Sequence, residues 1–218
     1  MTGLHVFDMD GTLLRGAASV ELSRHLGTFD EANAIENGWV RGEITETGFW
    51  ERMLPLWSAA SEADIDDAFA HAAWIDGVRE VFADIARRGE HSIVISQSPH
   101  FFVERLQRWG AHRTFGSQVG PHMRAEEWSL LTQQHKVDIT LSVLDELGID
   151  ESRCLAYGDS TSDVLLFEHL HNTVGVNSNG SLRSSATVVY DGDDIREAYA
   201  LGRSLWERSA TTCSESTS

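Results

Sequence analysis

Two aspartates follow a short apolar run near the start of the chain, in the stretch "LHVFDMDGT". The apolar residues 4–7 predict a buried strand, and Asp8 and Asp10 come directly after it, two residues apart. In open α/β sheets, ligands bind at the carboxyl ends of the strands. Two carboxylates held this close need a cation or a shared proton, so the pair indicates a charged site at that end of the sheet, although an ordinary Asp-Gly turn after a strand would place the same residues there.

Three more residues able to do chemistry lie at the ends of later apolar runs. Ser96 ends the run "IVIS", and Asp159 and Asp163 follow the run "CLAYG". A fourth feature is a lysine: the chain holds sixteen arginines and one lysine, Lys136, in "QQHKVDITL". Most surface positions accept either residue, so the lysine either survived by chance at a solvated helix start or belongs to a crowded site that needs a compact point charge.

The elements that must position these residues alternate between two patterns. Short apolar runs predict strands, and amphipathic stretches, each ending at a glycine, predict helices. Ser98 is the expected N-cap of one of these helices. The alternation predicts an α/β fold, a Rossmann-like parallel sheet with helices on both faces. The expected strands are 4–7, 90–96, 152–160, 172–177 and 186–190, and the expected helices are 76–89, 98–110 and 136–148.

The segment 16–72 breaks this alternation. It contains several helix signals and no convincing strand, and Ser61 precedes Asp64 by three residues as an approximate capping box. We therefore expect a small helical cap, residues 16–72, inserted after the first strand of a core made of residues 1–15 and 73–205. The Ser/Thr-rich residues 206–218 are expected to be a disordered tail.

The composition limits the partners and the location. The chain has 218 residues, 41% of them apolar, and a formal net charge of -17. Such an acidic surface argues against nucleic acid and anionic membranes as partners. The start has no basic segment before a long apolar run, and two separate cysteines, Cys154 and Cys213, form no disulfide framework. A cytoplasmic location is expected.

The stretch "DMDGTLL" resembles the first motif of the haloacid dehalogenase (HAD) superfamily, and three further motifs follow in order. Ser96 matches the second, Lys136 the third, and Asp159 with Asp163 in "GDSTSD" the fourth. A helical insert between the first two motifs is the arrangement of subclass I. Within it, the chain is similar to the phosphoserine-phosphatase-like group, and the resemblance implies the HAD fold.

The resemblance also implies a mechanism. Asp8 would be the nucleophile and form an aspartyl-phosphate, while Asp10 would protonate the leaving group and then deprotonate the attacking water. Mg²⁺ would be held by Asp8, Asp159, Asp163 and the backbone carbonyl of Asp10, because this ion prefers carboxylate, water and phosphate oxygens. An acid at position 10 favours phosphate esters over carbon–halogen bonds, since a departing halide needs no proton.

The remaining motif residues would bind the phosphate. Ser96 and Lys136 would contact its oxygens, with further contacts from Gly11, Thr12 and Gln97. The expected function is therefore Mg²⁺-dependent hydrolysis of a small-molecule phosphate monoester. Two alternatives stay open: a phosphotransferase or mutase on the same scaffold, and a non-enzymatic phosphate-sensing module. The sequence leaves open whether the chain is a monomer or a homodimer.

The chain also departs from true phosphoserine phosphatases. Gln97 and Ser98 replace their Gly-Gly pair, Ser162 replaces an asparagine, and Ala17 and Ala18 stand near the place of a cap glutamate. These differences weaken the case for phosphoserine itself. Specificity is expected to come from the cap, where some residues would line a pocket over the phosphate, although its aromatic rings would equally form the cap's own core. These residues are Trp39, Arg41, Glu43, Phe49, Trp50, Arg52 and Trp57.

Overall fold

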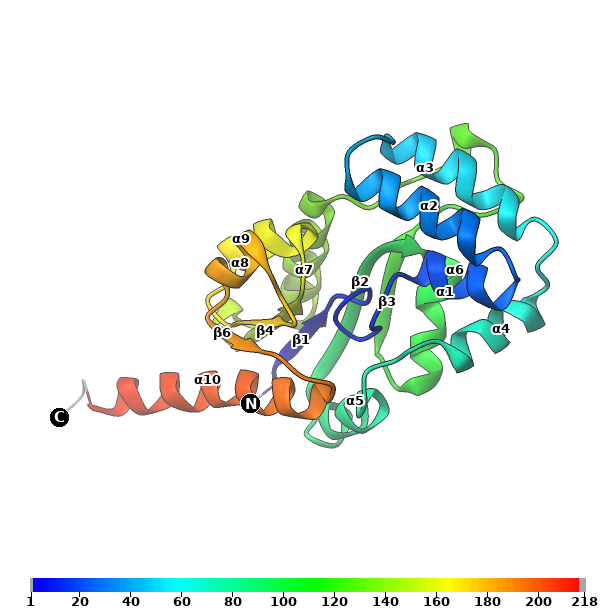
Figure 1. Ribbon diagram of the computed structural model, residues 1–218. Coiled ribbons are helices and arrows are strands. Elements are labelled where there is room, and N and C mark those ends of the chain that lie inside the picture. Colours follow the sequence, from blue (N-terminus) through cyan, green and yellow to red (C-terminus); the bar gives the residue numbers. More distant parts are fainter. Residues whose placement is uncertain (1, 216–218) are drawn as a thin grey trace.

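One parallel sheet forms the centre of the protein (Figure 1). The structure is a computed structural model that describes residues 2–215, with side chains described as far as Trp206. The strand order is β3-β2-β1-β4-β5-β6, and every pairing is parallel. This arrangement confirms the predicted α/β fold. The strands are β1 (Leu4–Phe7), β2 (His91–Pro99), β3 (Arg113–Ser117), β4 (Cys154–Gly158), β5 (Thr173–Val176) and β6 (Val188–Tyr190).

Helices cover both faces of the sheet, because the central strands are apolar on both sides. In β1, Leu4 and Val6 belong to one hydrophobic cluster, whereas Phe7 belongs to the other. The first cluster is covered by α7 (Gln133–Leu147), α8 (Val164–His169) and α9 (Gly180–Ser185), and the second by α5 (Val78–Arg87) and α10 (Ile195–Glu215). The two groups of helices lie on opposite sides of the sheet in Figure 1. Short 3-10 turns η3 (Ala125–Glu127), η4 (Glu151–Arg153) and η5 (Thr161–Asp163) complete the core.

The chain after β2 differs from its prediction. Strand β2 continues to Pro99, so Ser98 lies in the strand and is not a helix N-cap. The predicted helix 98–110 is instead two short pieces, α6 (His100–Val103) and η2 (Glu104–Trp109), which end at Gly110. Strand β3 was not predicted, since its sequence "RTFGS" lacks the apolar run that marked the other strands.

The segment predicted as a cap folds into helices that lie beyond the carboxyl ends of the strands (Figure 1). It contains α1 (Ala18–His25), α2 (Phe29–Val40), α3 (Glu46–Met53), η1 (Leu54–Trp57) and α4 (Glu62–His71). The capping box at the start of α4 is present: the Asp64 amide donates to Ser61 Oγ at 3.2 Å, and the Ser61 amide donates to Asp64 Oδ2 at 2.8 Å. We keep the name cap for residues 16–72.

The end of the chain also differs from its prediction. Helix α10 runs to Glu215, where a disordered tail from residue 206 was expected, while residues 216–218 lie outside the described residues. Leu205 and Trp206 are buried, and no glycine or proline follows Gly202 before the helix ends. Among the described helices, none has both the length and the apolar character needed to cross a bilayer.

A buried arginine joins the cap to the core. Arg105 in η2 is 1% exposed, and it donates to Asp66 Oδ1 and to Glu62 Oε2 of α4, both at 2.6 Å. It also donates to the backbone carbonyl of Phe101. The two bonds to Asp66 and Glu62 run from an enclosed guanidinium to carboxylates near the surface, so the side chain fixes α4 against the core.

We predict that Arg105→Met lowers the free energy of unfolding by about 1.5–3 kcal/mol, because charge-assisted bonds are lost at a buried site. Arg108→Met is a matched control, since Arg108 also pairs with Asp66, at 2.9 Å, but is 63% exposed. The control should lose less than about 1 kcal/mol. Urea unfolding of both variants measures the difference, and equal losses would contradict the assigned role of Arg105.

Candidate active site

The predicted aspartates meet at the carboxyl ends of β1 and β4, the place where the strand order reverses. Asp8 directly follows β1, and its amide donates to the Tyr157 carbonyl of β4 at 2.9 Å. Asp159 follows β4, and Asp163 ends the next turn, η5. Oxygens of Asp8, Asp159 and Asp163 all lie within 4.8 Å of one another. The pairing of two adjacent strands therefore brings together Asp8 and Asp159, which are 151 positions apart in the chain (159 − 8).

Lys136 supplies the positive charge among these carboxylates. Its Nζ lies 2.9 Å from Asp8 Oδ1 and 2.6 Å from Asp163 Oδ1, and it donates to Ser162 Oγ at 3.1 Å. Burial alone would lower the pKa of Lys136, but the charges of Asp163 and Asp8 raise it above its usual value. The lysine is therefore charged, and it lies in the first turn of α7, whose start is fixed by the Thr132 side chain accepting from the His135 amide.

One ammonium does not balance the buried carboxylates. Burial and the neighbouring charge of Asp163 raise the pKa of Asp8 well above its usual value, against the opposing effect of Lys136. Burial and Asp163 also raise the pKa of Asp159. A cation bound among these groups would favour their ionised forms, so the cluster has the electrostatic character of a metal site.

Asp10 is held by three donors. The Ala18 amide donates to Oδ1 at 2.6 Å, and the hydroxyls of Ser96 and Ser98 each donate to Oδ2 at 2.8 Å. Burial raises the pKa of Asp10, and these hydrogen bonds oppose the shift. Ser98 was missed as a site residue, although alternate strand residues share a face and Ser98 is two positions from Ser96. Ser96 was expected on the phosphate; in this structure its hydroxyl is engaged by Asp10.

The other predicted phosphate-binding residues lie beside this cluster. Gly11 has φ +78, and a Cβ there would lie 2.2 Å from Asp159 Oδ2, so only glycine fits the position. Thr12 Oγ1 is buried without a hydrogen-bond partner among the described residues. Gln97 lines the cavity over the aspartates, and its Nε2 donates to the Leu131 carbonyl at 3.0 Å.

The carboxylates present fit a divalent cation. Asp159 Oδ1 is buried without a hydrogen-bond partner among the described residues, and it is one of three carboxylates that converge. Mg²⁺ uses a small number of carboxylates together with water and phosphate oxygens. The two oxygens of Asp163 already accept from Lys136 and from the Asp159 amide, at 2.6 and 3.3 Å. Asp163 is therefore placed to orient the other groups as well as to add negative charge.

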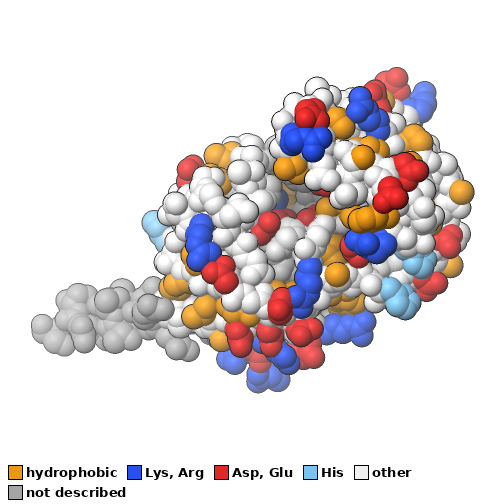
Figure 2. Space-filling view, in the orientation of Figure 1, with side chains coloured by type: hydrophobic (Ala, Val, Ile, Leu, Met, Phe, Trp, Pro, Cys, Tyr) orange, Lys and Arg blue, Asp and Glu red, His pale blue; other side chains and the backbone are white. Residues whose placement is uncertain are grey.

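A cavity of about 730 Å³ lies between the cap and this cluster. Figure 2 shows the hollow, with carboxylate side chains inside it. Asp8, Asp10 and Asp159 line it from the core. Its other walls are Gly11, Gly16, Ala17, Ser19, Glu36, Trp39, Val40, Glu46, Phe49, Trp50, Gln97, Ser98, Gln133, Ser160, Thr161, Ser162 and Asn179.

The predicted cap residues divide between this cavity and other places. Trp39, Phe49 and Trp50 line the cavity, whereas Trp57 is 1% exposed in the cap's own core and donates through Nε1 to a serine of α1. Arg41 forms two hydrogen bonds of 2.8 Å with Glu43 on the exposed surface. Arg52 does not line the cavity. Glu36 was missed, although it precedes Trp39 by three positions, the spacing of neighbours on one helix face.

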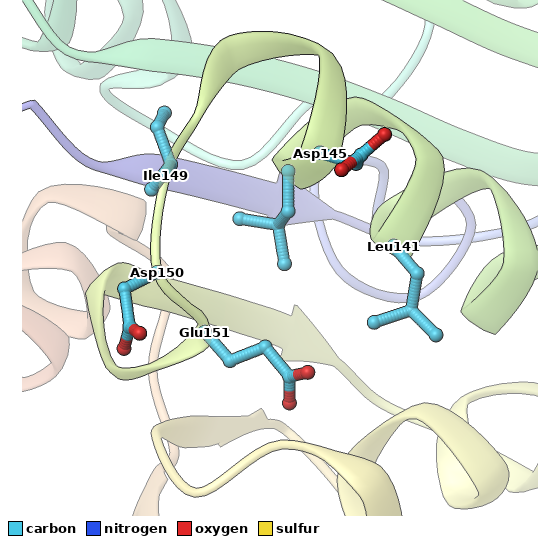
Figure 3. A pocket seen from close by; sticks show the side chains of 6 residues that line it. Leu141, Asp145, Ile149, Asp150 and Glu151 are labelled. Carbon is cyan, nitrogen blue, oxygen red and sulfur yellow. The ribbon is translucent and has the colours of Figure 1, made fainter.

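A second hollow of about 470 Å³ lies at the far end of α7 from Lys136. Figure 3 shows its side chains, which come from the last turns of α7 and from the loop that follows. Leu141, Leu144 and Ile149 face it together with Asp145, Asp150 and Glu151. None of the predicted site residues takes part in this hollow, so the candidate site is the cavity under the cap.

Comparison with known proteins agrees with this geometry. Residues 5–168 match the family of haloacid dehalogenase-like hydrolases. The chain belongs to this family. The match confirms the predicted resemblance and the prediction of an enzyme, and it leaves the phosphate-sensing alternative without support.

Several phosphoserine phosphatases resemble this family member across most of its length. The protein of Wolinella succinogenes is 23% identical, with 90% of this chain and 98% of that protein covered. The protein of Archaeoglobus fulgidus is also 23% identical, over 84% of this chain, but the chain spans only 55% of its length. A solved substrate-bound phosphoserine phosphatase complex is 18% identical, covers 92% of this chain and 98% of its own, and has a TM-score of 0.76. That structure confirms the fold.

We predict that Gly11→Ala weakens Mg²⁺ binding about 10–100-fold, because a Cβ at this position would displace the Asp159 carboxylate. Gly27→Ala is the matched control, since Gly27 has φ +76 but nothing within 4 Å of a Cβ. Both variants share the backbone strain of alanine at a positive φ, so the control isolates the effect of the contact with Asp159. Titration calorimetry with Mg²⁺ measures the affinities, and equal affinities in the two variants would contradict the assigned contact.

Proposed function

We propose that this chain is a Mg²⁺-dependent phosphatase, a phosphoric monoester hydrolase that cleaves a small-molecule phosphate monoester through an aspartyl-phosphate on Asp8. The observation that carries the proposal is that Asp8 and Asp10 line the same cavity, next to Lys136 and two further carboxylates. The relatives named phosphoserine phosphatases support this reaction class.

Asp8 is the proposed nucleophile. Its carboxylate lines the cavity, and Lys136 holds Oδ1 at 2.9 Å, which fixes the orientation of the group before substrate arrives. The attacking oxygen must approach a phosphate that is already anionic, so the ammonium offsets the repulsion between the two. The step forms an oxygen–phosphorus bond at Asp8 and breaks the bond to the leaving alcohol.

Asp10 is the proposed general acid and base. A buried carboxyl with a raised pKa retains a proton at higher pH than an ordinary aspartate, which suits donation to a departing alkoxide. The deprotonated group then takes a proton from the water that attacks the phosphoryl group on Asp8. The Ala18 amide and the hydroxyls of Ser96 and Ser98 hold the carboxyl in place through both steps.

The phosphate is proposed to lie over the start of the first turn. Gly11 leaves room for close backbone approach, and the buried Thr12 hydroxyl, which has no hydrogen-bond partner among the described residues, lies in this turn. Lys136 supplies positive charge beside Asp8, Gln97 of β2 lines the cavity, and Ser96 of β2 lies behind Asp10, to which its hydroxyl donates. These contacts would hold the transferring group rather than the alcohol that leaves.

Asp8, Asp159 and the backbone carbonyl of Asp10 would hold Mg²⁺, with Asp163 in support. When bound, the ion supplies positive charge for the phosphate oxygens and for the carboxylates around it. The cavity volume of about 730 Å³ suits a small substrate under the cap. A cytoplasmic location and the absence of nucleic-acid and membrane partners stay predictions.

The covalent step can be tested with 4-nitrophenyl phosphate, whose alcohol leaves without a proton. We expect Asp10→Asn to form the phosphoenzyme but to hydrolyse it about 10²–10⁴-fold more slowly, so that it accumulates. Asp8→Asn should give no phosphoenzyme and no turnover. Intact-mass measurement after acid quench detects the added phosphoryl group, with and without a chelator of Mg²⁺.

The control for these two variants is Asp67→Asn, because Asp67 is exposed on α4 and does not line the cavity. It should turn over like the natural protein. Phosphorylation of Asp8→Asn, or full turnover in the chelator, would refute the proposed mechanism. Phosphate release without an added acceptor distinguishes hydrolysis from phosphotransfer.

We predict that Lys136→Arg lowers kcat about 10²–10³-fold although the charge is kept. The Lys136 ammonium contacts both Asp8 and Asp163, and the residue is only 1% exposed. A planar guanidinium is wider and prefers side-by-side contacts, so it would not fit between the two carboxylates without displacing one of them. Arg113→Lys is the control and should keep its kcat, because Arg113 of β3 forms an exposed ion pair with Glu146 of α7. Steady-state kinetics on folded variants measures kcat. A Lys136→Arg variant with the same kcat as the control would show that the compact shape of the ammonium group is unimportant.

A further inference from the structure

The cap side of the cavity is lined by carboxylates and apolar side chains that have no role in the proposed phosphoryl transfer. Helices α2 and α3 each contribute one carboxylate and neighbouring apolar side chains at the spacing of one helix face. Three aromatic rings of this wall pack in a row. The centroids of Trp39 and Phe49 are 5.8 Å apart, and those of Phe49 and Trp50 are 4.8 Å apart. The six residues are Glu36, Trp39 and Val40 of α2, and Glu46, Phe49 and Trp50 of α3.

The charge of this wall is negative and is not balanced by protein groups. Among the described residues that line the cavity, none is arginine or lysine. In the described part of the chain, neither Glu36 nor Glu46 takes part in an ion pair, and the nearby Arg41 is engaged by Glu43. A substrate carboxylate in this space would find no cation there and would meet two carboxylates of its own sign.

Glu36 is the better placed of the two. It is half-buried, and its Oε2 accepts from Ser19 Oγ at 2.8 Å. Burial raises the pKa of Glu36, the Ser19 bond opposes the shift, and the charge of Asp10 adds to it. Such a carboxylate gains from a positive group supplied by a ligand.

Glu36 and Asp10 accept hydrogen bonds from two consecutive residues of the chain. Asp10 accepts from the amide of Ala18, and Glu36 accepts from the hydroxyl of Ser19, the next residue in the chain. Consecutive Cα atoms are about 3.8 Å apart. A short substrate can therefore contact Asp10 with its leaving oxygen and Glu36 with its other end, if only a few atoms separate the two. The aromatic rings that line the same cavity as Glu36 also attract a cation.

We propose, on the basis of the function proposed above, that the substrate is the phosphate ester of a short amino alcohol whose ammonium lies against Glu36 and the rings of Trp39, Phe49 and Trp50. The substrate carries no carboxylate. Specificity therefore comes from charge and aromatic contacts of the cap, while the phosphate is held by the core.

The test compares phosphocholine and phosphoethanolamine with their uncharged isosteres, 3,3-dimethylbutyl phosphate and propyl phosphate, and with phosphoserine. We expect kcat/KM for at least one ammonium ester to exceed that for its isostere and for phosphoserine by about tenfold or more. Glu36→Gln keeps a hydrogen-bond acceptor for Ser19 but removes the negative charge. It should reduce the ratio of kcat/KM for the ammonium ester to kcat/KM for its isostere by about tenfold. Glu31→Gln, which removes the same charge from an exposed position of α2, should leave that ratio unchanged.

The outcomes separate this inference from the proposed function. Equal kcat/KM for an ammonium ester and its isostere, or a preference for phosphoserine, would overturn the inference and leave the phosphatase intact. A preserved ratio in Glu36→Gln would remove Glu36 from the site and overturn it as well. Failure to hydrolyse every ester, 4-nitrophenyl phosphate included, would overturn both proposals.

Discussion

The balance of charge at the ends of β1 and β4 constrains the rest of the structure. Four aspartates lie there, and Lys136 is the ammonium enclosed among them. Carboxylates crowded in this way raise one another's pKa, and only close, well-directed cations and hydrogen bonds keep them ionised. The loops around the site are accordingly built to bring donors close, as the serines of β2 and the start of α1 do for Asp10.

The same crowding explains residues that carry no charge. A Cβ at Gly11 would overlap the Asp159 carboxylate, and a Cβ at Gly158 would lie 2.5 Å from Asp163 Cγ. Both glycines therefore serve the carboxylates by leaving space for them. The retained lysine fits the same logic, because its head group is small enough to lie between Asp8 and Asp163 while every other cation of the chain is arginine.

Local patterns explain why much of this arrangement was predictable from sequence. The strands that carry Asp8, Ser96 and Asp159 are apolar runs, and each site residue lies at the end of its run, so both the parallel sheet and the meeting point follow from short-range information. Strand β3 was missed because "RTFGS" lacks an apolar run, and the extension of β2 was missed because Ser98 and Pro99 are typical of a helix start. Glu36 was missed because its sequence position indicates only a helix, whereas the packing of α2 places it in the cavity. Helix α10 continued past the point where Ser/Thr-rich composition indicated disorder.

The position of β1 between β2 and β4 has a consequence for synthesis of the chain. Leu4 pairs with His91 on one side and with Cys154 on the other, so one edge of this apolar strand has no partner until the ribosome has produced residues 154–157. An unpaired apolar edge recruits other chains, and pairing across so long a loop is slow. Asp159 and Asp163 follow β4 within a few residues. The nascent chain thus acquires its full set of site carboxylates as it closes this edge of β1, and a product that terminates before β4 would have neither Asp159 and Asp163 nor a partner for that edge.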